Sequence, residues 1–462
     1  MQPKHISLIG AGLAGSLLSL YLAKRGYRVT VYERRPDARK VEISAGRSIN
    51  LALANRGITA LAEVGLLEQV KTLVIPMRGR MLHDEAGHLQ FQPYGRRPEE
   101  VIYSVSRQAL TALLMDTAQA TGQVQILFNQ RCQSIDFERH VLGLRDETDQ
   151  GLHRSSFARV IGCDGAHSRV RSAIMQATHG QCLEEPLAHS YKELSIPPGR
   201  NNTFQIEANA LHVWPRGEYM LIALPNLDGG FTATLFLPNE GEESFATLTD
   251  AERLYRFFHK RFPDAVTLMP NLVSEFFGHP TGRLSTIHTT PWHYRSEALI
   301  LGDAAHTLVP FHGQGMNCAF EDCRALNVCL TRLSEDWEAA FAEFENLRQP
   351  NAEAIADLSL ENYIEMRSAV RDPKFQLKKE LAWRLEDRYP EIFIPRYAMV
   401  MFHHTPYGEA KRRGTLQDQI LEMLLAGIES LEEVDYSYAD RLIKEKLGET
   451  RCPGLYGVGE RE

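Results

Sequence analysis

Three glycines near the N-terminus have the spacing that binds the phosphates of a dinucleotide. Gly10, Gly12 and Gly15 form a Gly-x-Gly-x-x-Gly turn between an apolar run starting at Ile6 and a helical pattern, and Glu33 ends a second apolar run. The first glycine permits a tight turn, the second lets backbone N–H groups approach a pyrophosphate, and the third lets the helix pack on the strand. A helix N-terminus favours phosphate, and the carboxylate of Glu33 could bind a ribose diol. The pattern predicts a dinucleotide site without saying which dinucleotide.

Two acidic residues and a glycine-rich loop follow later apolar runs and could serve the same ligand. Asp164 comes directly after the run at 160–162, and Asp303 comes after the run at 298–301. Open α/β sheets bind ligands at the carboxyl ends of their strands, so these carboxylates could hold a pyrophosphate and a polyol chain. The loop at 313–317 opens a helix whose N–H groups could stabilise negative charge on a ring. An ordinary strand-to-helix turn is the alternative interpretation of Asp164.

Several arginines occupy positions that would suit an anionic ligand. Arg34 follows the second apolar run, the segment 46–54 begins with Gly-Arg-Ser, and Arg80 is one of two arginines that flank Gly79. Arg107 lies in the first turn of a helix with a serine N-cap, where the helix dipole disfavours a cation, so we expect it to face an anion. Solvated surface arginines are the alternative at these positions.

The elements that would hold these residues follow from hydrophobic periodicity. Residues 5–33 read as a strand, turn, helix and strand, to which runs at 124–128, 160–162 and 298–301 would add strands of the same sheet. Residues 185–285 differ, because runs at 212–215, 219–224 and 231–236 predict an inserted antiparallel sheet with a hairpin turn at 226–230. Beyond Pro350 the pattern is helical.

Composition excludes several classes of protein. The 462 residues exceed what one hydrophobic core supports, so two or three domains are expected. A net charge of −8 without a long basic run argues against a nucleic-acid partner. Seven cysteines without a paired C-x-x-C spacing suggest reduced thiols and a cytoplasmic location, and we see no metal-binding spacing. No apolar run is typical of a membrane span.

Together, the glycine-rich turn, Asp164 and Asp303 resemble the single-component FAD-dependent aromatic hydroxylases over roughly the first 350 residues. The chain is also similar, over nearly its whole length, to one branch of that family, whose members hydroxylate L-kynurenine. The motifs that carry this similarity lie at 46–54, 77–81, 92–95, 191–194, 310–317, 361–366 and 393–397.

The resemblance implies an α/β fold with three parts. A Rossmann-like FAD-binding domain would comprise residues 1–75, 98–180 and 285–345, a substrate-binding β-sheet domain 76–97 and 181–284, and a C-terminal helical region 346–462. It also implies bound FAD, NADPH and O₂ as co-substrates, and a flavin C4a-hydroperoxide that hydroxylates L-kynurenine to 3-hydroxykynurenine in tryptophan catabolism. The flavin carries this chemistry, so we assign no acid or base catalyst.

The resemblance also assigns residues by motif. Contacts to FAD would come from Gly10, Gly12, Leu13, Gly15, Glu33, Arg34, Ala52, Arg107, Leu127, Asp164, Asp303, Gly315, Met316 and Asn317. Of these, Glu33, Arg34 and Arg107 would contact the adenosine and phosphates, with Leu13, Ala52 and Leu127 nearby, and Met316 and Asn317 would lie at the isoalloxazine. Substrate contacts would come from Arg80, Tyr94, Asn362, Tyr397, Ile222, Leu224, Phe236, Pro310, Phe311 and His312. Arg80 and Tyr94 would bind the amino-acid carboxylate.

Alternatives stay open at this point. Arg80 could belong to a surface ion pair, Tyr94 and Tyr397 could be core tyrosines, and His312 fits a loop position better than a proton donor. The substrate could be a related ortho-aminoaryl acid. A nicotinamide-dependent dehydrogenase and a non-enzymatic flavin-binding sensor are further possibilities. The sequence indicates neither the NADPH site nor whether the protein is a monomer or a homodimer.

Overall fold

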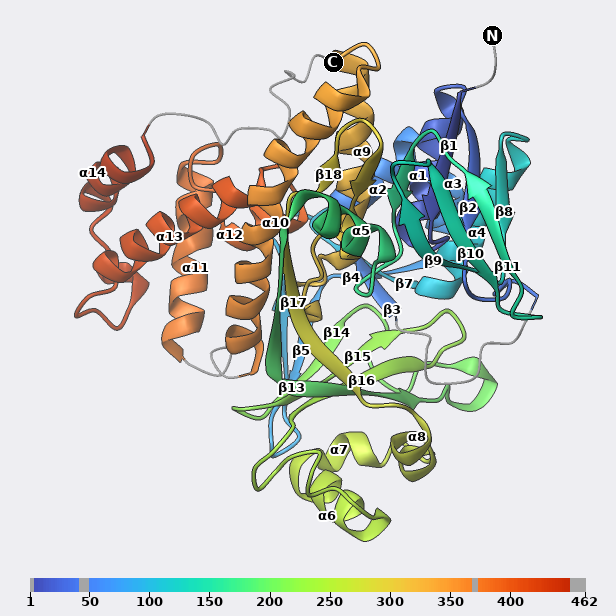
Figure 1. Cartoon of the computed structure of the whole chain (residues 1–462). Coiled ribbons are helices and arrows are strands. Elements are labelled where there is room, and N and C mark those ends of the chain that lie inside the picture. Colours follow the sequence, from blue (N-terminus) through green and yellow to red (C-terminus); the bar gives the residue numbers. More distant parts are fainter. Residues whose placement is uncertain (1–3, 41–49, 368–372, 449–462) are drawn as a thin grey trace.

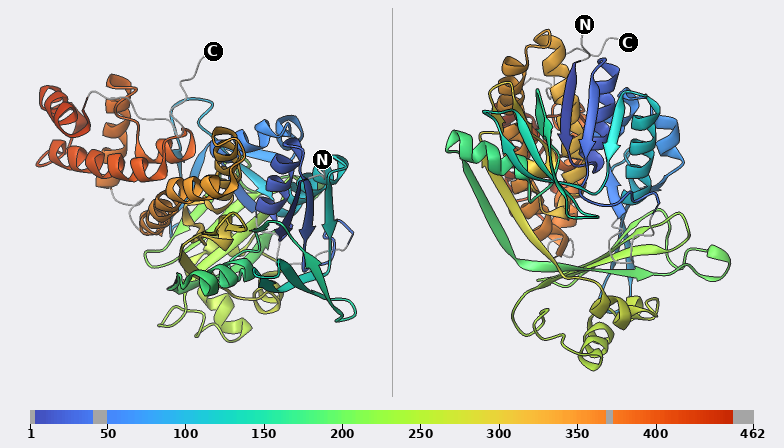
Figure 2. Two further views of the ribbon diagram at one scale, coloured as in Figure 1. Left: turned by 45° about the horizontal axis from the view of Figure 1, so that its top comes forward. Right: turned by 45° about the vertical axis from the view of Figure 1, so that its right-hand side comes forward.

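A computed structural model describes residues 4–40, 50–367 and 373–448 (Figure 1). Figures 1 and 2 show two larger β-sheets, with helices around the first, a helical layer beneath the second, and further helices that project to one side. The Gly-Arg-Ser sequence at 46–48 lies outside the described residues. No helix among the described residues is long and apolar enough to cross a membrane.

The glycine-rich turn lies in a βαβ unit, as the sequence predicts. β1 (His5–Ile9) pairs in parallel with β2 (Arg28–Tyr32), and α1 (Leu13–Lys24) connects them. Nearly every residue of α1 is buried, because the helix also packs against α4 (Arg107–Ala120) and α9 (Gly315–Arg332). The strands at 124–128, 160–162 and 298–301 join this sheet, so their prediction is confirmed. The sheet has the order β18-β19-β12-β1-β2-β8, and its other strands are β8 (Val124–Leu127), β12 (Val160–Gly162), β18 (His293–Tyr294) and β19 (Ala298–Ile300).

Two small sheets complete this part of the fold. One has the order β3-β7-β4, and the other is the meander β11-β10-β9. The meander was not predicted. Their strands are β3 (Asn50–Leu53), β4 (Val74–Met77), β7 (Ile102–Ser106), β9 (Gln130–Asp136), β10 (Val141–Asp146) and β11 (Leu152–Ser156), and the remaining helices here are α2 (Asn55–Glu63), α3 (Leu67–Lys71) and α5 (Arg169–Thr178).

The second sheet has the order β17-β13-β16-β15-β14-β5-β6 and is antiparallel except at one pair. β14 (Leu211–Pro215) runs parallel to β5 (Gly79–His83), which places Arg80 opposite Leu211. The predicted hairpin is present, with Pro225 opposite Phe231 and the amide of Asn226 donating to the carbonyl of Gly230. The other strands are β6 (Leu89–Pro93), β13 (Gln181–Ile196), β15 (Met220–Pro225), β16 (Phe231–Pro238) and β17 (Gly282–Thr290).

Three helices that the sequence analysis did not predict cover one face of the second sheet (Figure 1). They are α6 (Ala251–Arg261), α7 (Pro263–Val266) and α8 (Leu272–Gly278). In α6, Leu254, Phe257 and Phe258 recur at helical spacing and are buried against the sheet. The inserted region is therefore a sheet with a helical layer.

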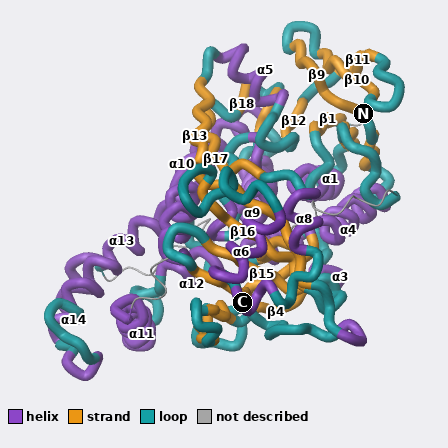
Figure 3. The backbone as a smooth tube through the Cα atoms, turned by 90° about the horizontal axis from the view of Figure 1, so that it is seen from below, coloured by secondary structure: helices purple, strands orange, loops and turns teal. Residues whose placement is uncertain are grey.

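The C-terminal region is helical, and its helices lie to one side of the sheets (Figure 3). α10 (Trp337–Arg367) begins before Pro350 and continues through it, so the boundary expected at 346 falls inside one helix. β17 likewise crosses the boundary expected at 285. The domain limits therefore stay an interpretation. The remaining helices are α11 (Pro373–Arg388), α12 (Arg396–Met401), α13 (Tyr407–Leu424) and α14 (Tyr436–Leu447).

Candidate active site

The three glycines of the first turn differ in the space around them. A Cβ atom at Gly10, where φ is +99°, would lie 2.5 Å from the carbonyl oxygen of Cys163, and one at Gly15 would lie 2.0 Å from the carbonyl oxygen of Gly10. A Cβ atom at Gly12 would meet no described atom within 4 Å. Gly10 and Gly15 therefore permit the turn and the packing of the helix. Gly12 leaves open space at the N-terminus of α1, which no described side chain caps, as a pyrophosphate requires.

Glu33 joins the end of β2 to the glycine-rich turn. Its carboxylate accepts hydrogen bonds from the backbone amides of Ala11 at 2.8 Å and Arg35 at 3.0 Å. Its own amide donates to the carbonyl of Leu127, so the end of β8 lies beside it. Leu13, which begins α1, is half-buried. These contacts fix a carboxylate beside the turn, where the ribose of a dinucleotide would lie.

The structure brings Asp164 and Asp303 to the same edge of the first sheet. A Cβ atom at Gly10 would lie 3.0 Å from the Cα of Asp164, and one at Gly302 would lie 3.6 Å from the Cβ of Ala14. The carboxylate of Asp164 accepts bonds from Ser168 and the amide of Arg169, and burial raises its pKa despite these bonds. Asp303 is exposed. Segments far apart in the sequence thus lie side by side at this edge of the sheet.

The loop at the start of α9 lies beside β3. Gly313 has φ of +66°, and the side chain of Asn317 donates to the carbonyls of Ala52 at 2.8 Å and Gly313 at 2.9 Å. Ala52 therefore contacts the loop assigned to the isoalloxazine. A Cβ atom at Gly315 would meet no described atom within 4 Å, which leaves the N-terminus of α9 accessible to a ligand.

The remaining predicted cofactor residues are placed as follows. Met316 is buried, whereas Arg34 and Arg107 are exposed. Arg107 begins α4, and Ser106 caps that helix by accepting a bond from the amide of Ala109. An exposed cation at this position fits a ligand phosphate, and its role stays a prediction.

A buried ion-pair network links two carboxylates of α9 to arginines of α2 and α10. Arg348 donates to Glu321 at 2.6 Å and to Asp322 at 2.7 Å, and Arg56 donates to Glu321 at 2.5 Å. Burial alone would raise the pKa values of both carboxylates. Their cationic neighbours outweigh burial, so the pKa of Glu321 is lowered, and that of Asp322 falls to about 2 beside His306 and Arg348. These groups therefore stay ionised, and they join α2, α9 and α10.

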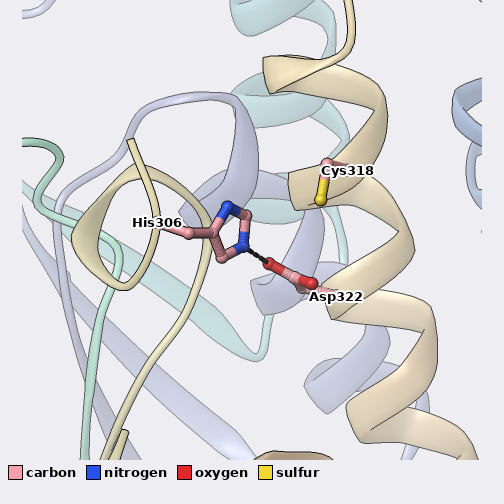
Figure 4. A group of neighbouring side chains, drawn as sticks. All are labelled: His306, Cys318 and Asp322. Atoms are coloured by element: carbon pink, nitrogen blue, oxygen red, sulfur yellow. Dashed lines mark hydrogen bonds and ion pairs between the residues drawn. The ribbon is translucent and has the colours of Figure 1, made fainter. Parts of the chain in front are cut away.

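Part of this network has the composition of a metal site (Figure 4). Ligand atoms of His306, Cys318 and Asp322 lie within 4.8 Å of one another. His306 is bonded to Asp322 at 2.6 Å, however, and the Arg348 guanidinium contacts both Asp322 and the sulfur of Cys318. A cation already neutralises this group, so we interpret it as structural. Our expectation that the protein has no metal site stays a prediction.

Arg80 is the central charged group of a cavity between the second sheet and the C-terminal helices. The cavity measures about 1110 Å³, including its solvent-open part. Arg80 donates to Glu365 at 3.0 Å and to the side-chain oxygen of Asn362 at 3.3 Å. Burial would lower its pKa, but the Glu365 carboxylate and nearby tyrosines raise it. Its Nε has no partner among the described residues. Arg80 is thus a buried cation whose Nε could still donate a hydrogen bond to a ligand.

A stack of three rings forms one side of this cavity. Tyr397 stacks on Tyr94 with centroids 5.2 Å apart and on His312 with centroids 5.6 Å apart, and the Arg80 guanidinium lies 5.5 Å from the Tyr397 ring. Burial raises the pKa of both tyrosines, so they stay protonated. Burial and nearby arginines lower the pKa of His312 to about 3, so its ring is neutral at physiological pH.

The predicted apolar substrate contacts gather next to this cavity. Phe236 and Phe311 lie 5.0 Å apart between ring centroids, and Ile222 packs against the same cluster. Leu224 packs in a second cluster with Tyr94. The side-chain amide of Asn362 donates to the carbonyl of Phe311, which links the polar and apolar halves. Pro310 is exposed at the start of the short 3₁₀ turn that carries Phe311 and His312.

Of the charged cavity residues that were not assigned from the sequence, two lie close to Arg80. Glu365 pairs with Arg80, and Lys379 of α11 lines the same cavity. Glu365 lies three residues after Asn362 on one helix and therefore on the same face, a signal that could have identified it. Lys379 has no such signal, because it reaches the cavity only through the packing of α11.

Comparisons with known proteins agree with this geometry. A family model described as an FAD binding domain matches residues 5–191 and 255–359. A solved structure of 2-methyl-3-hydroxypyridine-5-carboxylic acid oxygenase is similar in fold, with a TM-score of 0.66 at 17% identity, covering 81% of this chain and 95% of that one. The family model and the fold thus define an FAD-binding protein with the fold of this oxygenase.

Two curated relatives identify the family within this class of FAD-binding proteins. The chain is 46% identical to "Kynurenine 3-monooxygenase" of Myxococcus xanthus, over 96% of this chain and 95% of the relative. It is 47% identical to the protein of that name from Stenotrophomonas maltophilia, over 96% of this chain and 97% of the relative. The chain belongs to the kynurenine 3-monooxygenase family, which confirms the resemblance found in its sequence. A dehydrogenase and a non-enzymatic sensor are thereby excluded.

Proposed function

We propose that this FAD-dependent monooxygenase hydroxylates L-kynurenine to 3-hydroxykynurenine in tryptophan catabolism, with NADPH and O₂ as co-substrates. The observation that carries the proposal is the buried guanidinium of Arg80, whose Nε has no partner among the described residues. The cavity that holds it is also lined by His312 of the loop before α9. The names of the 44–47% identical relatives support the choice of substrate.

Arg80 binds the amino-acid carboxylate in this proposal. A planar guanidinium suits a carboxylate bidentately, and the buried setting strengthens the bond. The carboxylate replaces Glu365 as the main counter-ion of Arg80, which frees Glu365 to accept a bond from the α-ammonium of the substrate. Tyr94 and Asn362 lie on either side of Arg80 and limit where the carboxylate can bind.

The aromatic ring lies among the apolar residues near Phe236 and Phe311. The amino group of the substrate ring donates electron density to the ortho carbon, so no strong base is needed to activate the ring. A neutral His312 agrees with this chemistry, because its low pKa makes it a poor proton donor at neutral pH. The apolar side chains orient the ring and exclude water from the reacting carbon.

The residues of the first domain fit FAD. When bound, FAD takes reducing equivalents from NADPH and supplies the oxygen-transfer chemistry. Gly12 leaves room for the pyrophosphate, and Glu33 and Asp303 offer carboxylates to hydroxyl groups. The open N-terminus of α9 would offer N–H donors to negative charge on a bound isoalloxazine. The NADPH site, the cytoplasmic location and the oligomeric state stay outside this proposal.

The test is turnover by the purified holoenzyme. We expect L-kynurenine, NADPH and O₂ to give 3-hydroxykynurenine, identified by mass spectrometry, with NADPH oxidation that depends on the substrate. A panel of other ortho-aminoaryl acids separates the alternative substrates. Product from one of them with none from L-kynurenine would replace the proposed substrate, and bound flavin without any hydroxylated product would contradict the proposed activity.

A further inference from the structure

Helix α11 forms part of the wall of the cavity and contributes Lys378 and Lys379 to it. Lys379 and Arg80 line the same cavity, although they lie nearly three hundred residues apart in sequence. The Nζ of Lys379 donates a 2.9 Å hydrogen bond to the carbonyl of Pro93 and lies 5.0 Å from the ring centroid of Trp383. Pro93 follows Gln92, the residue that pairs with Arg80 across β5 and β6. The ammonium group is thus held one residue from the register partner of Arg80.

Lys379 has no paired carboxylate in the part of the chain that the structure describes. Among the described residues, no carboxylate oxygen lies within 4.0 Å of its Nζ, whereas Arg56, Arg348 and Arg80 all have such partners. Arg80 and Lys379 therefore share one inner carboxylate, Glu365, and these three groups together carry one positive charge. The titratable groups that face Lys379 in this cavity are Arg80 of β5, Tyr94 just after β6, Glu100 before β7, His312 of the loop before α9, Glu365 of α10, Lys378 and Glu386 of α11, Arg396 and Tyr397 of α12, and Asp418 of α13.

The outer charges of this set have partners other than Arg80 and Lys379, and one of these partners, Arg97, does not line the cavity. Lys378 and Arg396 both pair with Asp418, and Glu100 and Glu386 both pair with Arg97. The inner group differs, because Arg80 and Lys379 have only the carboxylate of Glu365 between them. The carboxylate of the substrate's amino-acid head would give these two cations a second partner, while its α-ammonium pairs with Glu365.

We propose that Lys379 is the second cation of the carboxylate subsite, so that the bound substrate links the C-terminal helices to the second sheet. This inference rests on the proposed function and adds a specificity-determining residue to it. Arg80 supplies the bidentate contact, and Lys379 supplies a point charge from α11.

The ionisation of Lys379 makes the inference testable. Burial, and then the nearby Arg80, lower its pKa to about 8, although Glu365 acts in the opposite direction. The side chain is therefore charged below pH 8 and loses its proton above it. Substrate binding should weaken as the pH rises through this value. An arginine at this position keeps its charge throughout and should remove that weakening.

A purely structural role predicts different behaviour. If the only role of Lys379 is its hydrogen bond to the carbonyl of Pro93, its replacement lowers the melting temperature of the protein and leaves KM for L-kynurenine unchanged. Lys374 offers a matched control, because it is an exposed lysine on the same helix. Its replacement removes the same charge from α11 without reaching the cavity.

The experiment measures KM and kcat for L-kynurenine from about pH 6.5 to about pH 9.5 in the holoenzyme. We expect K379M to raise KM about tenfold at neutral pH with kcat changed less than about twofold, since a bond to a charged group is lost. K374M should match the wild type. K379R should keep a low KM and lack the rise above pH 8 that the wild type shows.

The results distinguish a substrate-binding role of Lys379 from a purely structural one. An unchanged KM in K379M, or parallel pH profiles of KM for the wild type and K379R, would overturn the inference while the proposed function stands. A wild type that forms no 3-hydroxykynurenine would overturn the proposed function and this inference with it. If K379M does not fold, the profile of K379R against the wild type still decides.

Discussion

Arg80 is the residue on which substrate binding depends in this account. Its replacement by alanine removes a buried charge-assisted partner, which costs on the order of 2 kcal/mol or more. We therefore expect R80A to raise KM for L-kynurenine at least about thirtyfold, with retained FAD. Steady-state kinetics measure this effect.

The neighbouring arginine provides the control. Arg78 is exposed just before β5 and differs from Arg80 in facing solvent. R78A should leave KM within about twofold of the wild type, because surface charges contribute little. Equal effects of the two substitutions, or none from R80A, would contradict the assigned role.

His312 provides a test at acid pH. Its pKa is about 3 in the folded protein, below the ordinary value of 6.5, so the unfolded chain binds more protons as the pH falls. The contribution of His312 to stability is thus present above its unfolded pKa and is lost as the pH falls below it, by about 2 kcal/mol at pH 5. Urea unfolding at pH 7 and pH 5 should show H312Q losing less stability than the wild type. Identical losses would contradict a buried neutral histidine.

At this scale the sequence predicts residues that belong to motifs and misses those placed by packing. Arg80, Tyr94, Asn362, Tyr397 and His312 all line one cavity, as the resemblance implied. Ala52 instead contacts Asn317, because β3 leads directly into the helix that packs on α9. Lys379 could not be predicted, since nothing local to α11 indicates that the helix folds back over the sheet.

The first βαβ element allows a direct comparison between two glycines. At Gly15 an added methyl group would lie 2.0 Å from the Gly10 carbonyl, whereas at Gly12 it would enter open space. We expect G12A to fold with near-normal stability as apoprotein and to bind FAD at least about tenfold more weakly, since the methyl group occupies space needed by the pyrophosphate. G15A should destabilise the apoprotein itself.

Apoprotein melting and FAD titration by flavin fluorescence separate these effects. We expect G15A to lower the melting temperature of the apoprotein more than G12A does. We expect G12A to lower only the affinity for FAD. An apoprotein of G12A that melts as low as G15A, or one that binds FAD normally, would contradict the separate roles of the two glycines.

Elements with strong local patterns were predicted, and those that depend on partners were not. The βαβ unit, the hairpin and the serine cap of α4 are each encoded by a few adjacent residues. The parallel pairing of β5 with β14 joins segments more than a hundred residues apart, so no local pattern indicates it. The C-terminal helical region was expected to begin at 346, but α10 begins at Trp337 and continues through Pro350.

The buried network of Arg56, Glu321, Arg348 and Asp322 concerns the whole molecule. Arg56 also donates to carbonyls of Met399, Val400 and Thr405, so the network joins the FAD-binding part to the C-terminal helices. R348M would leave two buried carboxylates with fewer partners, and we expect a loss of about 3–5 kcal/mol in the free energy of unfolding.

Urea unfolding of the holoprotein measures this loss. R256M is the control, because Arg256 pairs with Glu252 on an exposed helix face and should change stability by less than about 1 kcal/mol. A loss in R348M no larger than in R256M would show that the network does not hold the two parts together.

The most direct test of the account is a crystal structure of the holoenzyme with L-kynurenine. We predict that the substrate carboxylate contacts the guanidinium of Arg80 in place of Glu365, and that the aromatic ring lies between Phe236 and Phe311 and the flavin at the start of α9. A substrate bound with its carboxylate away from Arg80, or an FAD that does not run from Glu33 past Asp303 to Asn317, would contradict the account.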